Sequence, residues 1–333
     1  MLSYVVGRVI RLIPLLLLIS IVVFIIIQLP PGDYLTEHIA RLRQSGYKLD
    51  QAEIERLKRL YALDKPMYVQ YLKWIGNILL RGDLGMSYQW RMPVSEVIGE
   101  RMALTVAISV STVFFCWGIA IPIGIYVAVR QYSLSDYFFT FLGFIGLATP
   151  SFLLAMVIMY TAFSKFGVNV GGLFSPEHQL APWSLAKVAD MMKHIWVPVV
   201  VLGMAGTARL IRTMRAVMLD ELSKQYVMTA RAKGLSERRL ILKYPVRLAI
   251  NPIISTVGWL LPWFFSGGML TAIVLNLPTA GPVLWQSLMA QDMFLAGSFV
   301  LITSTLTVIG TLLSDILLAW VDPRIRFGRV GEG

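Results

Sequence analysis

The amino-acid sequence predicts an all-α polytopic membrane protein with about six transmembrane helices. Of its 333 residues, 56% are hydrophobic and only 15% are charged, whereas an average soluble domain is about 25% charged. The hydrophobic residues gather in long blocks, and uncharged stretches of ~18 or more residues are typical of transmembrane helices. The net charge of +11 lies mostly in short loops between these blocks, as in membrane proteins with basic cytoplasmic loops. We therefore expect contact with membrane lipid and no binding of nucleic acid.

Six apolar blocks are the predicted spans, and the fourth is the weakest because Pro198, Gly203 and Gly206 interrupt it. The first block is longer than the apolar region of a typical signal peptide and lacks a small-x-small cleavage site after it. We therefore interpret it as a retained span, with a cleaved signal peptide as the alternative. The blocks cover residues 12–29, 102–129, 137–164, 195–210, 248–275 and 294–320.

Basic residues in the short loops predict the orientation of the chain. Sixteen Lys and Arg residues lie in the loops on one side of the blocks and three in the short loops on the other side. Because basic loops stay in the cytoplasm, both termini are predicted to be cytoplasmic. The predicted parts are therefore residues 1–29 (the N-terminal cytoplasmic residues and the first span), 30–101 (an extracytoplasmic loop domain), 102–320 (the transmembrane core) and 321–333 (a cytoplasmic tail).

Short helices are expected outside the six blocks. In the 30–101 loop, "TEHIARLRQSG", "DQAEIERLKRLYAL" and "YVQYLKWIGNILL" have helical patterns, and "RGDLG" is a turn. This loop is either a solvated cap or a docking surface for a soluble partner. After the fifth block, "PTAGPVLWQSLMAQ" predicts a short re-entrant or interfacial helix.

The sequence contains no motif that predicts an enzyme. No Gly-Lys pair occurs, so a phosphate-binding loop of the G-x-x-x-x-G-K-[ST] type is absent. His38, His178 and His194 have no metal-ligand spacing, and each is expected to be solvated. The single cysteine, Cys116, is expected to be a small buried hydrophobe. No cofactor or metal site is therefore predicted in this chain.

A short basic segment between the fourth and fifth blocks predicts a helix, a glycine turn and a second helix. We expect the first helix to begin near Leu219, where Asp220 and Glu221 would complement its dipole. Gly234 fits the left-handed position after a helix. A second helix, "ERRLILKY", would start at Ser236 as N-cap and end or kink at the following proline. Both helices lie within residues 219–246 of the predicted transmembrane core.

Proline and glycine interrupt several blocks, which is typical of kinked, closely packed helices and of translocation pathways. The polar or aromatic side chains at these breaks are candidates for the pathway, although core packing is an alternative for each of them. These candidates are Thr149, Ser151, Ser255, Trp259 and Trp263.

The segment "TARAKGLSERR" resembles the coupling motif of ABC-importer membrane subunits, in the form found in the dipeptide/oligopeptide/nickel permease family. The match to the general form E-A-A-x-x-x-G retains only Ala230 and Gly234. Further segments resemble this family in the same order along the chain: "GRVIRLIPLLL", "PPGD", "ALDKPMYVQYLKW", "GDLGMS", "RMPVSEVIGERMALT", "GLATPSFLLA" and "SDILLAWVDPRIRFG".

The resemblance implies the permease subunit of a binding-protein-dependent ABC importer in a bacterial or archaeal inner membrane. Its implied partners are a homologous second permease, two ATPase subunits that bind ATP and magnesium, and an extracytoplasmic substrate-binding protein. Peptides are the implied substrate, with oligosaccharides or nickel as alternatives. A self-contained secondary carrier or channel, and an assembly protein without transport, are the other classes. By this resemblance, residues 102–320 are the permease core and residues 219–246 are its coupling helices. The implied ATPase-coupling residues are Thr229, Ala230, Arg231, Ala232, Lys233, Gly234, Leu235, Ser236, Glu237 and Arg238.

Overall fold

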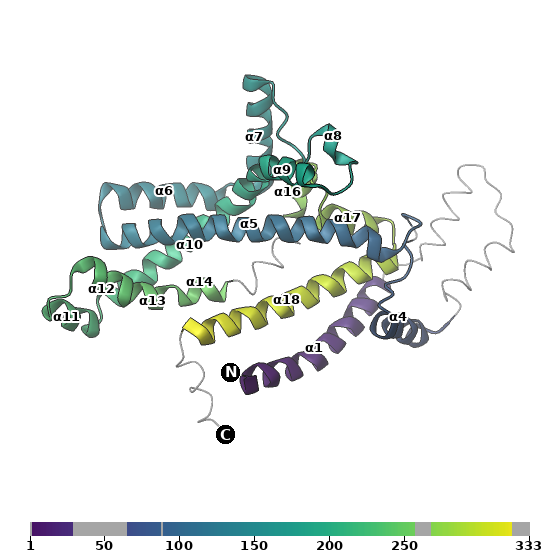
Figure 1. Cartoon of the computed structure of the whole chain (residues 1–333), viewed down its shortest axis with the longest axis horizontal. Helices are drawn as coiled ribbons and strands as arrows, with labels where there is room; N and C mark the ends of the chain where they lie inside the picture. The colour runs from purple at the N-terminus through teal and green to yellow at the C-terminus, as the bar shows by residue number, and fades with distance from the viewer. Residues whose placement is uncertain (1, 29–64, 88, 257–267, 322–333) are drawn as a thin grey trace. The chain divides into compact units, whose positions relative to one another are not determined.

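A computed structural model describes residues 2–28, 65–87, 89–256 and 268–321 (Figure 1). Within these residues the chain is helical and contains no β-strand, only an isolated bridge between Met86 and Pro93. The predicted all-α class is therefore confirmed. The chain divides into two compact units. One contains residues 1–6, 104–278 and 307–333, and the other contains residues 7–103 and 279–306.

The larger unit contains most of the helices, and three long helices, α1, α5 and α18, each have residues in both units. The helices of this unit are α5 (Val94–Val129), α6 (Leu134–Ala148), α7 (Ser151–Phe166), α8 (Pro176–Gln179), α9 (Leu185–His194), α10 (Trp196–Leu222), α11 (Gln225–Ala232), α12 (Glu237–Lys243), α13 (Pro245–Ala249), α14 (Asn251–Ser255), α16 (Met269–Val274) and α18 (Met293–Val321). The other unit holds α1 (Leu2–Gln28), α4 (Met67–Arg81) and α17 (Ala280–Met289).

Among the described residues, three helices are long and apolar enough to cross a membrane: α5, α10 and the Met293–Leu318 part of α18. The α6–α7 pair would be a fourth span if it is counted as one, and α1 contains a shorter apolar stretch, Leu12–Ile26. The predicted fifth span lies partly outside the described residues. The polytopic class is supported, and the total of six spans stays a prediction.

The third predicted span is broken at Pro150, one of the prolines that interrupt the apolar blocks. α6 and α7 meet at an angle of 99°. Thr149 has an extended backbone, with φ −87° and ψ 118°, and Pro150 precedes the first residue of α7. Proline disfavours a helical backbone in the residue before it and cannot donate a helical hydrogen bond itself. The break therefore follows from the sequence "ATPS".

The fourth predicted span was expected to close at Arg209, but α10 continues to Leu222. Arginine is a good helix former, so a charged residue can end an apolar stretch without ending the helix. α10 is consequently long enough to carry the chain from a span directly to the basic segment that follows it.

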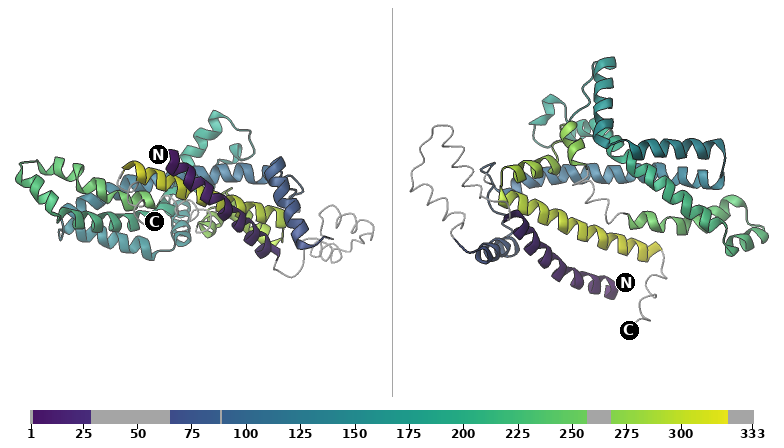
Figure 2. Two further views of the ribbon diagram at one scale, coloured as in Figure 1. Left: turned by 90° about the horizontal axis from the view of Figure 1, so that it is seen from below. Right: turned by 180° about the vertical axis from the view of Figure 1, so that it is seen from behind.

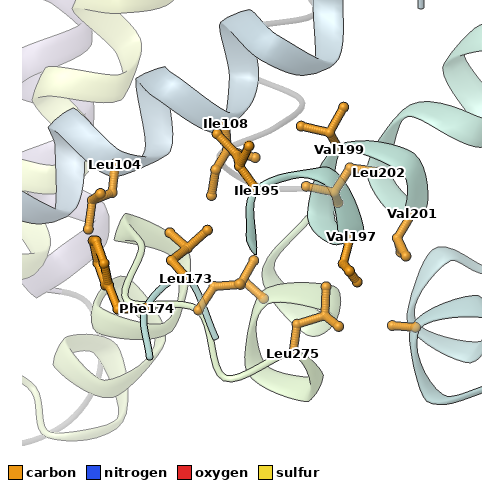
Figure 3. Packing of buried hydrophobic residues seen from close by; sticks show 13 residues of the cluster. Leu104, Ile108, Leu173, Phe174, Ile195, Val197, Val199, Val201, Leu202 and Leu275 are labelled. Carbon is orange, nitrogen blue, oxygen red and sulfur yellow. The ribbon is translucent and has the colours of Figure 1, made fainter. Parts of the chain in front are cut away.

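Two hydrophobic clusters hold the larger unit together. In the first, Leu104 and Ile108 of α5 gather with residues of α10, including Val197 and Leu202, and with Leu275 (Figure 3). The second cluster also joins α5 and α10, and it includes residues of α13 and α14. α10 thus packs against α5, α6, α7, α13 and α14.

Glycines let neighbouring helices approach α10 closely. A Cβ atom at Gly124 of α5 would lie 2.5 Å from Cβ of Met214, and one at Gly203 would lie 2.8 Å from the Phe115 ring. On α6, a Cβ at Gly146 would lie 3.4 Å from Cβ of Ala208. Small residues at helix interfaces are typical of membrane proteins, where close van der Waals packing drives association.

In the second unit, α4 packs on α1. The Phe24 ring lies 5.5 Å from the ring of Tyr71 and 5.6 Å from that of Trp74, and the hydroxyls of Ser20 and Tyr71 are 2.8 Å apart. The helix predicted from "YVQYLKWIGNILL" is therefore confirmed, whereas the two helices expected before it lie outside the described residues.

Two further predictions of local structure in this unit are confirmed. The "RGDLG" turn has left-handed glycines at Gly82 and Gly85. The helix expected from "PTAGPVLWQSLMAQ" is α17, although its re-entrant or interfacial location stays a prediction.

Candidate functional site

The basic segment forms a helical hairpin of α11 and α12 at the end of α10 (Figure 2). Its first helix begins at Gln225 and not near Leu219 as expected. Asp220 and Glu221 therefore lie in the last turn of α10. The backbone N–H of Lys224 donates to Glu221 O (3.2 Å), and the Ser223 hydroxyl donates to Asp220 O (2.8 Å). These bonds close a turn that no glycine or proline marks in the sequence.

Gly234 is the turn between the two helices, as predicted. Its φ is +81°. The N–H of Gly234 donates to Arg231 O (3.0 Å), and the N–H of Leu235 donates to Ala230 O (3.3 Å). This pair of bonds is the Schellman arrangement, which requires a left-handed residue after the helix. A Cβ at Gly234 would meet no atom within 4 Å, so the position needs glycine for its backbone conformation and not for space.

The second helix begins after Ser236, at the predicted position, but the Ser236 side chain makes no capping hydrogen bond. Glu237 instead pairs with Arg231, with Nε–Oε1 and Nη2–Oε2 distances of 2.5 and 3.1 Å. The hydrogen bonds from Arg231 lower the pKa of the Glu237 carboxyl, and the same bonds raise the pKa of Arg231. The pair joins the end of α11 to the start of α12 across the glycine turn.

The hairpin has its own small apolar core. Val227, Ala230 and Leu240 are buried against one another, and Leu235 and Tyr244 are partly buried beside them. Most of the apolar residues of this segment thus hold the two helices together. Met228 and Leu242 stay exposed.

Most of the predicted coupling residues are on the surface of the hairpin. Ala230 belongs to its core and Leu235 is partly buried. The exposed members are Thr229, Arg231, Ala232, Lys233, Gly234, Ser236, Glu237 and Arg238. These exposed residues, of which three are basic and one is acidic, form what we call the coupling surface.

Both ends of the hairpin lead back to α10. At its start, only the turn at Ser223–Lys224 separates α11 from α10. At its end, Pro245 begins α13, in agreement with the predicted break, and α13 packs against α10. Val246 of α13 lies in the same buried cluster as Met214 and Met218. A displacement of the hairpin would therefore act on α10 through two connections.

The described pathway candidates make hydrogen bonds within the chain. Thr149 donates to Ile145 O (2.8 Å) at the α6–α7 break, and Ser255 donates to Asn251 O (3.0 Å). The Ser151 hydroxyl lies 2.8 Å from that of the buried Thr271, so it joins α7 to α16. Trp259 and Trp263 lie outside the described residues. A role in translocation stays a prediction for all five.

The structure brings together two histidines that the sequence left apart. The Nδ1 atoms of His178 and His194 lie 3.8 and 3.7 Å from carboxylate oxygens of Asp190. The Ser175 N–H and hydroxyl both donate to that carboxylate at 2.7 Å, and these bonds lower the pKa of Asp190. In the sequence, only the i, i+4 spacing of Asp190 and His194 could have indicated this cluster. No group that could hold a metal occurs among the described residues.

Comparison with known proteins gives matches along nearly the whole chain. Residues 120–327 match the family described as binding-protein-dependent transport system inner membrane component, and residues 1–109 match the N-terminal family of such membrane components. The oligopeptide transport system permease protein AppB of Bacillus subtilis is 35% identical over 329 residues, which is 98% of this chain and 100% of that protein.

Other relatives have similar coverage. A glutathione transport system permease protein, GsiC, of Salmonella paratyphi A is 32% identical over 327 residues (98% of this chain and 100% of that protein). A putative peptide permease protein of Brucella ovis is 30% identical over 332 residues (98% and 99%). With its apolar helices and these end-to-end matches, the chain belongs to the family of inner membrane components of binding-protein-dependent transport systems.

Proposed function

We propose that this chain is a permease subunit of an ATP-driven importer, that it forms half of a translocation pathway for peptides, and that its coupling surface docks on a separate ATPase. The observation that carries this proposal is the exposed α11–α12 hairpin, which is joined to α10 at both of its ends. A rigid hairpin with its own core can be moved as one body. Since α10 is long and apolar enough to span a membrane, that movement would reach the pathway.

The need for a separate ATPase follows from what the sequence lacks. No Gly-Lys pair occurs anywhere in the chain, so the usual phosphate-binding loop cannot be formed. ATP and magnesium are therefore assigned to two partner ATPase subunits. The complete assembly would also contain a homologous second permease and an extracytoplasmic substrate-binding protein, as the family membership implies in general terms.

The proposed topology follows from the basic loops. The chain is multi-pass, both termini are cytoplasmic, and the 30–101 segment is extracytoplasmic. The coupling surface contains Arg231, Lys233 and Arg238, so it lies on the cytoplasmic side by the same rule. The ATPases that dock on this surface are therefore proposed to lie in the cytoplasm.

The peptide assignment rests on the relatives, which are named oligopeptide, peptide and glutathione permeases. No residue described here distinguishes peptides from oligosaccharides or nickel. Specificity in such importers is expected to reside largely in the binding protein, whose bound ligand can be identified by mass spectrometry and measured by calorimetry.

Uptake into proteoliposomes tests the proposal. The chain is purified with its second permease and the ATPases, reconstituted, and supplied with the binding protein and with labelled oligopeptides, oligosaccharides or Ni²⁺ in parallel. We expect oligopeptide uptake only when ATP, the ATPases and the binding protein are all present. Uptake by this chain without ATPases would indicate a carrier or channel, and uptake of oligosaccharide or nickel alone would overturn the peptide assignment.

A further inference from the structure

An ion pair joins α6 to α10 inside the larger unit. The Arg215 guanidinium donates from Nε and Nη2 to the two carboxylate oxygens of Asp136, each at 2.7 Å. Asp136 is only 2% exposed. Two parallel hydrogen bonds between planar groups fix the relative orientation as well as the distance of their helices. No local sequence pattern indicates this pair, because its members are separated by 79 positions.

Asp136 also organises the turn before α6. Its carboxylate accepts the backbone N–H of Tyr132 at 3.0 Å, and Tyr132 has a left-handed backbone with φ 62°. The N–H of Asp136 itself donates to the capping side chain of Ser133 at 3.3 Å. One buried carboxylate thus connects the α5–α6 turn, the first turn of α6 and a side chain of α10.

The position of Arg215 along α10 suggests what the pair does. Arg215 is about two helical turns before Leu222, where α10 meets the hairpin. Its neighbours Met214 and Met218 pack in the cluster that receives α13. Arg215 therefore lies at the level where α13 packs on α10, about two turns from the direct connection at Leu222.

The other described contacts between α6 and α10 are less directional than this pair. A Cβ added at Gly143 or Gly146 would lie 4.0 or 3.4 Å from Cβ of Ala208, and Arg212 lies over the Phe144 ring at 5.3 Å. Packing of this kind holds two helices close together but allows one to slide along the other. A buried bidentate pair resists sliding, because separating its members would leave a charge unpaired inside the protein.

We propose that Asp136 and Arg215 are positioning residues that make α6 follow α10 when the coupling surface moves. This inference rests on the proposed function. Motion entering at the hairpin passes along α10 to Arg215 and through Asp136 to α6. α6 carries it to the break at Thr149–Pro150, where the chain turns by 99° into α7. The same link works in reverse when the binding protein acts from outside.

The test compares two arginines of α10 in the reconstituted assembly. Arg215→Lys keeps the charge, so Asp136 is not left unpaired, but it loses the two-pronged geometry. Arg212→Lys is the matched control, because Arg212 also faces α6 from α10. It lies over the Phe144 ring at 5.3 Å, and a lysine there keeps the charge that interacts with the ring. ATPase activity is measured with and without the binding protein, together with uptake of labelled oligopeptide per ATP hydrolysed.

For Arg215→Lys we expect basal ATPase activity close to wild type, with stimulation by the binding protein and uptake per ATP both reduced about fivefold or more. Asp136→Asn should show the same pattern, and Arg212→Lys should behave as wild type. If Arg215→Lys matches wild type, or if it lowers basal and stimulated rates in equal proportion, the pair only holds the fold and the proposal is overturned. If the binding protein does not stimulate the ATPase activity of the wild-type assembly, that result would instead contradict the proposed function itself.

Discussion

The α11–α12 hairpin and the packed faces of α10 are built in opposite ways. The hairpin is local: its turn, its ion pair and its core come from residues 225–244. The packed faces of α10 instead depend on residues far away in the chain, such as Gly124 of α5 and Asp136 of α6. The turn of the hairpin has room for a side chain at Gly234, but its left-handed backbone disfavours any residue other than glycine. The faces of α10 have no room for added side-chain volume at the glycines that contact them.

The largest expected effect comes from adding volume at a face of α10. Gly124→Leu would place a side chain where even a Cβ lies 2.5 Å from Cβ of Met214. Overpacking typically costs about 1–3 kcal/mol, occasionally more. The same Cβ would lie 3.2 Å from the backbone oxygen of Ile211, so α10 has little room to relax. We expect a lower midpoint of thermal unfolding in detergent and less folded protein in the membrane.

Gly118→Leu is the matched control for that change. Gly118 lies on the same helix and is exposed, and a Cβ there would meet nothing within 4 Å. Its unfolding midpoint should stay at or slightly above that of wild type, because glycine inside a helix is unfavourable by roughly 0.5–1 kcal/mol. Equal destabilisation by the two substitutions would show that close approach at Gly124 is not the cause.

A medium effect is expected at Gly234, and it should affect coupling more than stability. Gly234→Val forces a β-branched residue into φ +81°, which costs roughly 1–2 kcal/mol for an ordinary residue. The hairpin turn should rearrange while the spans stay inserted. We expect normal amounts of membrane-inserted protein with reduced oligopeptide uptake per ATP.

Asparagine, which adopts the left-handed region more readily than other residues, provides the comparison at this position. Gly234→Asn should keep more of the uptake than Gly234→Val, although both add atoms at the same exposed place. Unaltered uptake in the valine variant would count against the coupling role, and equal loss in both variants would point to contact with the added side chain instead of backbone strain.

The smallest expected effect is at the Arg231–Glu237 pair, because both side chains are about half exposed and exposed ion pairs contribute little. The pKa of Glu237 is lowered in the folded hairpin. The pair therefore stabilises the hairpin above the ordinary Glu pKa, and this contribution disappears as the pH falls through the lowered value.

Hydrogen exchange at the amides of residues 235–240 measures this effect. Glu237→Gln should exchange slightly faster than wild type at pH 7, and the difference should vanish at acid pH and shrink in high salt. A difference that persists at pH values well below the ordinary Glu range would show that Glu237 acts through packing and not through its charge.

Several features were predictable because they depend on neighbouring residues. Gly234, the break at Pro245 and the helix Met67–Arg81 follow from turn chemistry and helical periodicity. The start of α11 was predicted too early, because Ser223 and Lys224 carry no breaker signal and the helix ends through bonds that Ser223 and Lys224 make to the last turn of α10. Pro150 indicated a bend next to Thr149, but the angle of that bend could not be predicted from the sequence.

By itself the sequence determined the all-α membrane class, the absence of a phosphate-binding loop and the glycine turn of the coupling surface. These properties depend on composition, on motifs and on the φ that one residue must adopt. Only the tertiary structure decided that Asp136 pairs with Arg215, that His178 and His194 share Asp190, and that Gly124 and Gly146 lie against α10. Such contacts join residues far apart in the chain, and their partners are selected by the packing of whole helices, which no local pattern records.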